Sequence, residues 1–167
     1  RERNIGERNI LSTMQKITLL LVGRPKTPWI VEGMDQFSKR LRFSVDLRFV
    51  EVAPSKSPDA EKQREEESQK ILDHLEKLQG QKILLDELGT SVTSKTFSSL
   101  LTKAKDAGDT CVFVLGGSFG VTDAVRTAVN KSIRLSDMTF PHELCALIFL
   151  EQLYRASEIE KGSGYHH

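Results

Sequence analysis

The chain has 167 residues, of which 38% are hydrophobic and 28% charged, a composition typical of a globular protein with one hydrophobic core. With 24 basic and 23 acidic residues its net charge is +1, which excludes a strong attraction of the whole molecule to nucleic acid. A nucleic-acid partner would therefore need a local basic patch. The longest apolar run, residues 144–150, is too short to cross a bilayer, and we find no apolar segment typical of a signal peptide.

The two ends of the chain differ from the rest. The sequence ERNI occurs at residues 2–5 and again at 7–10, without any apolar periodicity. We therefore expect residues 1–13 to be an appended or disordered leader, or the remnant of a targeting segment, and residues 14–167 to form a single domain. Taken alone, the final His166 and His167 are either native or the remnant of an affinity tag.

Predicted strands and helices alternate along the chain. Apolar runs predict strands at residues 16–22, 82–86 and 111–115, and alternating polarity predicts a half-buried or edge strand at 46–52. Residues 87–92 are predicted as a loop. Proline in the first turn is expected to start helices at Pro28, Pro58 and Pro141. The predicted caps are Ser57 for the helix from Pro58, Thr93 or Ser94 for the next helix, and Thr122 for the one after that. This alternation predicts an α/β fold, with a mostly parallel sheet and helices on both faces.

The last predicted helix is apolar on every side over residues 144–150. One side of such a helix can cover the sheet, and the other side needs a further apolar partner. We expect this partner to be a second copy of the chain, in a homodimer. The alternative is a helix buried within the core of its own domain.

Two loops form the candidate ligand site, one directly after the predicted strand at 111–115 and one before the last predicted helix. The first contains Gly116, Gly117 and Gly120, and the second covers residues 135–140. In an open α/β sheet ligands bind where such loops meet, beyond the carboxyl ends of the strands. The glycine spacing fits neither the dinucleotide fingerprint, which needs glycine where Leu115 stands, nor a P-loop. These glycines are explained equally well by a tight turn alone as by the close approach of a ligand.

Other single residues carry weaker signals. Cys111 and Cys145 lie in apolar segments and are expected to be buried free thiols, without the spacing of a zinc site. For His142, at a helix start, packing or capping is favoured over catalysis. Arg155 either contacts phosphate or RNA, or stabilises the end of its helix. Spacing alone indicates no catalytic triad and no pair of catalytic carboxylates.

Several longer motifs occur together in one order. FVLGGSFG, LSDMTFPHEL, EQLYRA and the terminal GYHH follow a start that reads MQKITLLLVGR. Over residues 14–167 this combination resembles the SPOUT-class pseudouridine N3-methyltransferases of the large ribosomal subunit. The tail matches the Tyr-His ending of that family, which favours native Tyr165 and His166. His167 stands where the family leads us to expect a basic residue.

The resemblance implies a trefoil-knotted α/β fold, S-adenosylmethionine as cofactor and no metal. It also implies a homodimer in which each site is completed across the interface, in agreement with the apolar helix. The cofactor would be held by the backbone of the knot loops. Carried onto this chain, the cofactor-binding residues are Leu85, Gly116, Gly117, Leu135, Ser136, Asp137, Met138, Thr139 and Phe140.

The implied reaction is methyl transfer to N3 of a pseudouridine in large-subunit rRNA, with the assembled ribosome as the expected substrate. Tyr165 and His166 are the candidates for substrate contact or proton transfer, and Arg155 for a phosphate contact. Two alternatives remain: a non-catalytic RNA- or ribosome-binding dimer with the same fold, and a methyltransferase of another RNA such as tRNA. The expected location is the bacterial cytoplasm, or a plastid or mitochondrion if the source is a plant, without attachment to a membrane.

Overall fold

The computed structural model describes residues 14–167, so the predicted leader lies outside the described residues. Strands and helices alternate along this part of the chain, as expected. In chain order the elements are β1 (Gln15–Val22), α2 (Pro28–Leu41), β2 (Val45–Val52), α3 (Ala60–Lys77), β3 (Gln81–Ser91), α4 (Ser94–Asp106), β4 (Cys111–Leu115), α5 (Asp123–Ala128), β5 (Lys131–Arg134) and α6 (His142–Lys161).

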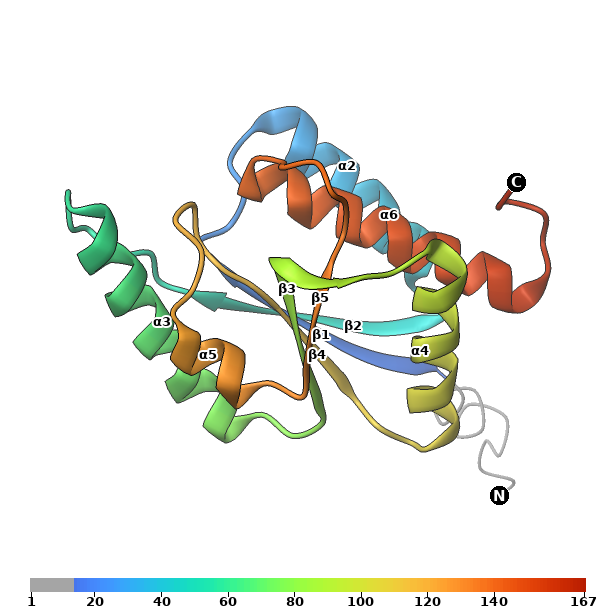
Figure 1. The fold of residues 1–167 in the computed structure, drawn as a ribbon. Helices are drawn as coiled ribbons and strands as arrows, with labels where there is room; N and C mark the ends of the chain where they lie inside the picture. Colours follow the sequence, from blue (N-terminus) through green and yellow to red (C-terminus); the bar gives the residue numbers. More distant parts are fainter. Residues whose placement is uncertain (1–13) are drawn as a thin grey trace, which may run out of the picture.

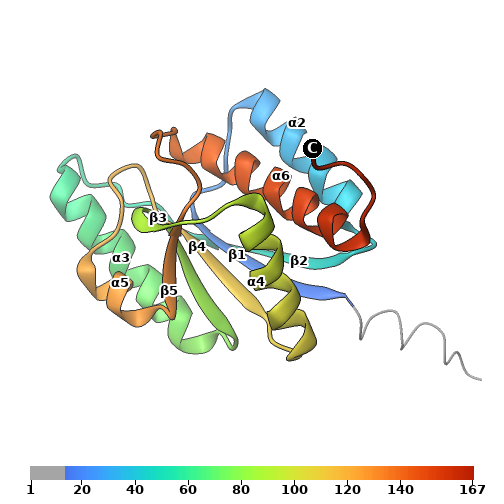
Figure 2. The ribbon, with the colours of Figure 1, turned by 45° about the vertical axis from the view of Figure 1, so that its right-hand side comes forward.

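The five strands form one sheet in the order β2-β1-β4-β3-β5, and every strand pair is parallel. Helices α2, α4 and α6 cover one face, and α3 and α5 cover the other (Figure 1, Figure 2). The predicted α/β architecture is therefore confirmed. β2 lies at one edge of the sheet, as its alternating pattern predicts. The trefoil knot stays a prediction from the family resemblance.

Each face of the sheet has its own core. On the face of α2, α4 and α6, the rings of Phe97, Phe113 and Phe149 pack with centroids 4.7–6.3 Å apart. On the other face, Ile71 and Leu75 of α3 pack with apolar residues of the strands and α5. The central strands β1 and β4 are buried on both faces, which explains their nearly continuous apolar sequences.

Strand β3 corrects one prediction. It continues to Ser91, so most of the expected loop at 87–92 is strand. Ile133 of β5 stands opposite both Leu85 and Thr90, with an irregularity of β3 between them. Within this irregularity, a Cβ atom on Gly89 would come within 2.6–2.7 Å of the backbone of Ile133. Alternation of polar and apolar residues could not predict this extension of β3, because it forms by pairing with the short β5.

The helix starts agree only in part with the predicted caps. Thr93 caps α4 by accepting a hydrogen bond from the Thr96 amide at 3.1 Å, as expected. Ser57 does not cap α3, because that helix begins only at Ala60. Its cap is Asp59, whose carboxylate accepts a hydrogen bond from the Lys62 amide at 2.8 Å. Thr122 has the N-cap position of α5 without a side-chain capping bond, and Pro141 precedes the first turn of α6.

Neighbouring helices cover much of the apolar segment of α6. Within residues 144–150, Ala146, Phe149 and Leu150 are buried and the other four are half-buried. α2 comes close enough that a Cβ atom on Gly33 would lie 2.9 Å from Leu147. The homodimer interface stays a prediction. No helix in residues 14–167 has the length and hydropathy to cross a membrane.

Candidate functional site: a cavity at the carboxyl ends of the strands

A cavity of about 950 Å³ lies where the loops after β3, β4 and β5 converge. Its volume suits a small-molecule ligand or cofactor. Of the nine residues predicted to bind the cofactor, only Asp137 does not line the cavity. Its carboxylate is largely exposed and lies 2.6 Å from Nε of Arg134. The other eight, which line the wall, are Leu85, Gly116, Gly117, Leu135, Ser136, Met138, Thr139 and Phe140. Their role in binding stays a prediction.

The glycine loop on one side of the cavity is packed closely from behind. Gly116 is buried, and Cγ1 of Val121 lies 2.7 Å from the position that a Cβ atom would take there. The amide of Gly120 donates to the carbonyl of Gly117 at 3.1 Å, with a positive φ of 76° at Gly120. The loop is therefore a tight turn, and its backbone also lines the cavity. Its close approach to a ligand stays a prediction.

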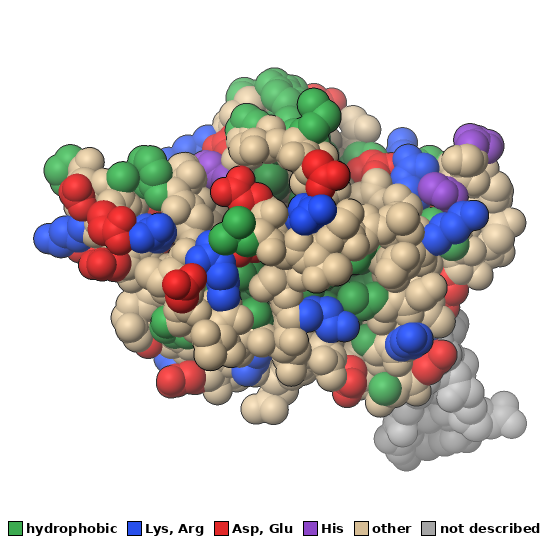
Figure 3. Space-filling view, in the orientation of Figure 1, with side chains coloured by type: hydrophobic (Ala, Val, Ile, Leu, Met, Phe, Trp, Pro, Cys, Tyr) green, Lys and Arg blue, Asp and Glu red, His purple; other side chains and the backbone are tan. Residues whose placement is uncertain are grey.

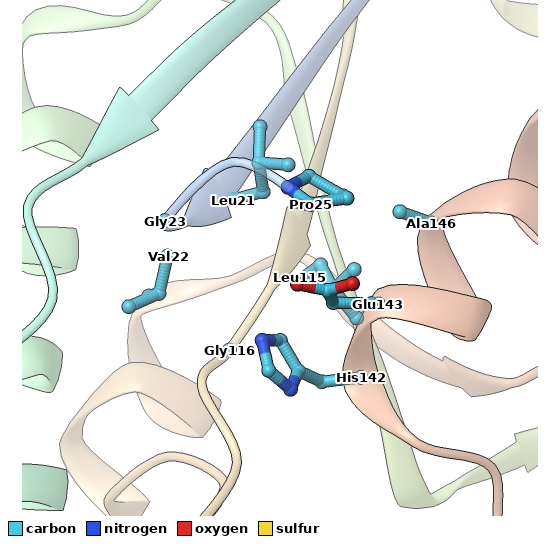
Figure 4. Close-up of a pocket in the computed structure, with 9 residues that line it drawn as sticks. All are labelled: Leu21, Val22, Gly23, Pro25, Leu115, Gly116, His142, Glu143 and Ala146. Atoms are coloured by element: carbon cyan, nitrogen blue, oxygen red, sulfur yellow. The ribbon is translucent and has the colours of Figure 1, made fainter. Parts of the chain in front are cut away.

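The first turn of α6 joins this loop to the segment after β1. Figure 4 shows His142 beside Gly116, and Glu143 near Pro25. Nδ1 of His142 lies 3.2 Å from the Ser118 hydroxyl. The Glu143 carboxylate accepts hydrogen bonds from the amides of Lys26, at 3.0 Å, and Thr27. His142 thus has the packing role that its position favoured, and it also lines the cavity.

The cavity wall also carries an ion pair that no sequence pattern predicted. Nε of Arg126 lies 2.5 Å from Asp86, whose side chain is 9% exposed, and Nη1 lies 2.9 Å from the exposed Asp123. The hydrogen bond to Asp86 raises the pKa of Arg126 above its ordinary value. The position of Asp86 directly after Leu85, at the end of a predicted strand, was the available signal. Nothing in the sequence connects it with Arg126 on α5.

The three predicted catalytic residues lie together, at the far end of α6 from the cavity. The guanidinium carbon of Arg155 lies 4.9 Å from the ring centroid of Tyr165, and its Nη1 is 3.5 Å from Nδ1 of His166. Glu151 connects the group, because it pairs with Arg155 at 2.6 Å and accepts from the Tyr165 hydroxyl at 3.3 Å. Glu151 was not among the predicted site residues, although it stands four residues before Arg155 on a helix.

This tail cluster of Glu151, Arg155, Tyr165 and His166 does not line the cavity of its own chain. Cys145 lines the cavity and Arg155 belongs to the cluster, ten residues further along α6. At a rise of about 1.5 Å per residue, about 15 Å of helix separates them. Within one chain, the predicted cofactor residues and the predicted catalytic residues therefore form two separate groups.

The two cysteines have different surroundings. Cys111 is fully buried, and burial raises the pKa of its thiol to about 11. Cys145 is half-buried in the cavity wall, and burial also raises its pKa. Within residues 14–167 no three His, Cys, Asp or Glu side chains are grouped as metal ligands would be.

Comparison with known proteins shows which family the chain belongs to. The family model described as "Predicted SPOUT methyltransferase" matches residues 15–166. The chain belongs to the SPOUT methyltransferase family, and it is thus a methyltransferase. It is 37% identical, over 91% of its length and 99% of the relative's, to "Ribosomal RNA large subunit methyltransferase H" of Geobacter sp. (strain M21). A relative of the same name from Clostridium botulinum (strain Kyoto / Type A2) is 38% identical, over 90% of this chain and 98% of the relative.

Among solved structures, the fold resembles a probable methyltransferase from Bordetella pertussis Tohama I. The TM-score is 0.56 with 11% sequence identity, over 91% of this chain and 99% of that one. A likeness at this identity concerns the fold alone, and it agrees with the parallel sheet and its helices.

The cofactor of the family, S-adenosylmethionine, suits the cavity. The molecule combines an aromatic ring with ribose hydroxyls and a positively charged sulfonium. The cavity offers apolar surface from Leu85, Leu115 and Phe140, backbone of the glycine loop, and the carboxylate of Glu87. Apolar walls with a few polar groups are the usual character of a cofactor site.

Proposed function

We propose that this chain transfers a methyl group from S-adenosylmethionine to N3 of a pseudouridine in large-subunit rRNA. The observation that carries the proposal is the convergence of eight predicted cofactor residues on one cavity at the carboxyl ends of the strands. The substrate follows from the names of the full-length relatives and from the motifs of the resemblance. The proposed location in the cell is the bacterial cytoplasm, or an organelle with ribosomes of bacterial type.

Bound S-adenosylmethionine supplies a methyl group already activated for nucleophilic attack by its sulfonium. The protein has to hold the base in line with this methyl group and accept the proton of N3. The cavity residues hold the cofactor, and the tail cluster contacts the nucleotide. Arg155 is fixed by Glu151 and presents its remaining donors to a phosphate.

Within the tail cluster, His166 is the better candidate for the proton acceptor. Burial, and next the charge of Glu151, raise the pKa of Tyr165 above its ordinary value of 10. The phenol therefore stays protonated at neutral pH and acts as a hydrogen-bond donor. A neutral imidazole has a free nitrogen that can accept a proton.

We further propose that the tail cluster of one protomer completes the cavity of a second copy. The support is the separation of about 15 Å along α6 between the two groups within one chain. Both groups must reach the same nucleotide, and a symmetric dimer can bring the tail of each subunit to the cavity of the other.

The reaction is tested with labelled S-adenosylmethionine and ribosomes that lack the modification, with naked rRNA and tRNA in parallel. We expect label in large-subunit rRNA, at N3 of a pseudouridine. Label in tRNA alone would assign another substrate. A folded protein that neither binds S-adenosylmethionine nor transfers label would instead be a non-catalytic RNA-binding protein.

The shared site is tested by co-expression of two inactive variants with different affinity tags. Gly116→Val distorts the cavity wall, because its side chain would overlap Val121, and it leaves the tail intact. His166→Ala removes the imidazole of the tail and leaves the cavity intact. A doubly purified heterodimer has one intact composite site, so we expect about half of the wild-type activity. If each protomer used its own tail and cavity, this heterodimer would be inactive.

A further inference from the structure

Three exposed arginines differ from the other arginines of residues 14–167. Five arginines lie within 4.0 Å of a carboxylate: Arg24, Arg64, Arg126, Arg134 and Arg155. In the same part of the chain, Arg40, Arg42 and Arg48 have no such partner. With a net charge of only +1, unpaired guanidinium groups are places where the molecule can attract an anion locally.

Two of these arginines lie at one end of the molecule, beside the tail. Arg40 is in the last turn of α2 and Arg42 directly follows the helix. α2 and α6 run side by side and end near the tail (Figure 1, Figure 2). Figure 3 shows basic side chains close to the histidines there. Arg48 belongs to β2, where Val50 and Val52 pack on the α3 face and place Arg48 on that face too.

Aromatic rings hold both arginines in place. The guanidinium carbon of Arg40 lies 5.4 Å from the ring centroid of Phe37 and 5.6 Å from that of Tyr154. Tyr154 in turn packs edge-on against Tyr165, with centroids 4.9 Å apart. Stacking on aromatic rings orders a guanidinium and leaves its N–H groups free for phosphate oxygens. Arg40 is thus connected to the tail cluster through the contact between Tyr154 and Tyr165.

Phe43 adds an aromatic surface beside these charges. Its side chain is 74% exposed, and the guanidinium carbon of Arg42 lies 4.5 Å from its ring centroid. Proteins that bind unpaired RNA combine backbone contacts from arginine with aromatic rings on which bases stack. The last-turn position of Arg40 also suits the helix dipole, but this effect explains neither the exposed ring nor the unpaired Arg42.

We propose that Arg40, Arg42 and Phe43 form an RNA-contact surface that extends the tail cluster. This arginine–aromatic surface binds the strand next to the target nucleotide, through phosphate contacts from the arginines and stacking of one unpaired base on Phe43. It depends on the proposed function, since the tail cluster defines where the target nucleotide lies. A near-neutral protein thereby acquires a local basic surface at the place where the substrate arrives.

The test measures binding of ribosomes that lack the modification, by co-sedimentation at several salt concentrations, together with steady-state methylation. We expect Arg42→Ala to weaken binding and to lower the slope of log K against log salt by about 0.7 to 0.9. Phe43→Ala should weaken binding roughly tenfold with little change in this slope. Both should raise KM for ribosomes more than they lower kcat. Arg48→Ala is the matched control, because it removes an unpaired exposed arginine from the other face.

Equal effects of Arg42→Ala and Arg48→Ala, or an unchanged salt slope with Arg42→Ala, would overturn the proposal. So would a change from dimer to monomer in Arg42→Ala, since the surface would then pack against a second copy. Wild-type protein that binds ribosomes through this surface but transfers no label would refute the proposed reaction alone. Wild-type protein that transfers label and is insensitive to Arg42→Ala and Phe43→Ala would refute this surface alone.

Discussion

The carboxylate of Glu67 occupies the space that a side chain on Gly117 would need. Glu67 is 1% exposed on α3, and its Oε1 accepts a hydrogen bond from the Ser55 amide at 3.0 Å. Its Oε2 lies against Gly117 and has no hydrogen-bond partner within the described residues. The glycine loop that lines the cavity is thus supported from behind by a buried carboxylate.

We therefore expect Gly117→Ala to destabilise the protein by about 1–3 kcal/mol, because the new methyl group overpacks the site. It should also weaken S-adenosylmethionine binding, since the loop must move toward the cavity. Denaturant unfolding and calorimetric titration measure the two effects.

The double variant Glu67→Ala/Gly117→Ala identifies the cause. Removal of the carboxylate makes room for the methyl group, so the two substitutions should couple by about 1 kcal/mol or more. Additive effects would mean that Gly117 is required for another reason.

The two carboxylates that bind Arg126 should contribute very differently to stability. Asp86 is 9% exposed and Asp123 is 97% exposed. Asp86→Ala removes the better-buried partner and should cost about 1–3 kcal/mol. Asp123→Ala should stay within about 0.5 kcal/mol, as is usual for an exposed ion pair.

Salt separates these two contributions further. The Asp86 effect should persist at about 1 M salt, whereas any effect of Asp123 should vanish there, because buried pairs are screened much less. Equal unfolding free energies for the two variants would contradict this interpretation of the cavity wall.

Glu143 should make the junction between α6 and α2 sensitive to acid. Hydrogen bonds from Thr27 and from the Lys26 amide hold the pKa of Glu143 below its ordinary value of 4.5. A lowered pKa in the folded state stabilises the protein above pH 4.5, and this stabilisation is lost as the pH falls through the folded-state pKa.

The measurement compares unfolding free energies of wild type and Glu143→Gln across this range. The difference between the two proteins should be largest at neutral pH and should shrink on acidification. A difference that stayed constant from about pH 7 to about pH 3 would show that the charge of Glu143 has no part in it.

Thiol labelling should distinguish the two cysteines and report on the cavity. Cys111 is fully buried with a pKa of about 11, so it should react with a maleimide only after unfolding. Cys145 is half-buried in the cavity wall and should react slowly in the native protein.

S-adenosylhomocysteine should slow the reaction of Cys145, as followed by intact-mass spectrometry, because a ligand in the cavity covers the thiol. Cys145→Ser is the control and should show no native labelling. Labelling of Cys145 at the same rate with and without saturating ligand would argue against the cavity as the cofactor site.

The sequence by itself determined the alternation of strands and helices, the parallel sheet and the edge at which the ligand loops meet. These features follow from local apolar patterns and from the rule that parallel strands end at a common edge. The family motifs added the candidate residues, and eight of the nine cofactor candidates line one cavity.

Only the tertiary structure decided the contacts between distant segments. The extension of β3 depends on pairing with β5, and the Asp86–Arg126 pair joins residues 40 positions apart. The Glu67–Gly117 contact and the distance of the tail cluster from the cavity are likewise invisible in any local pattern. Packing of the helices on the sheet sets these relations, because each depends on where two segments meet in space rather than on the residues next to them in the chain.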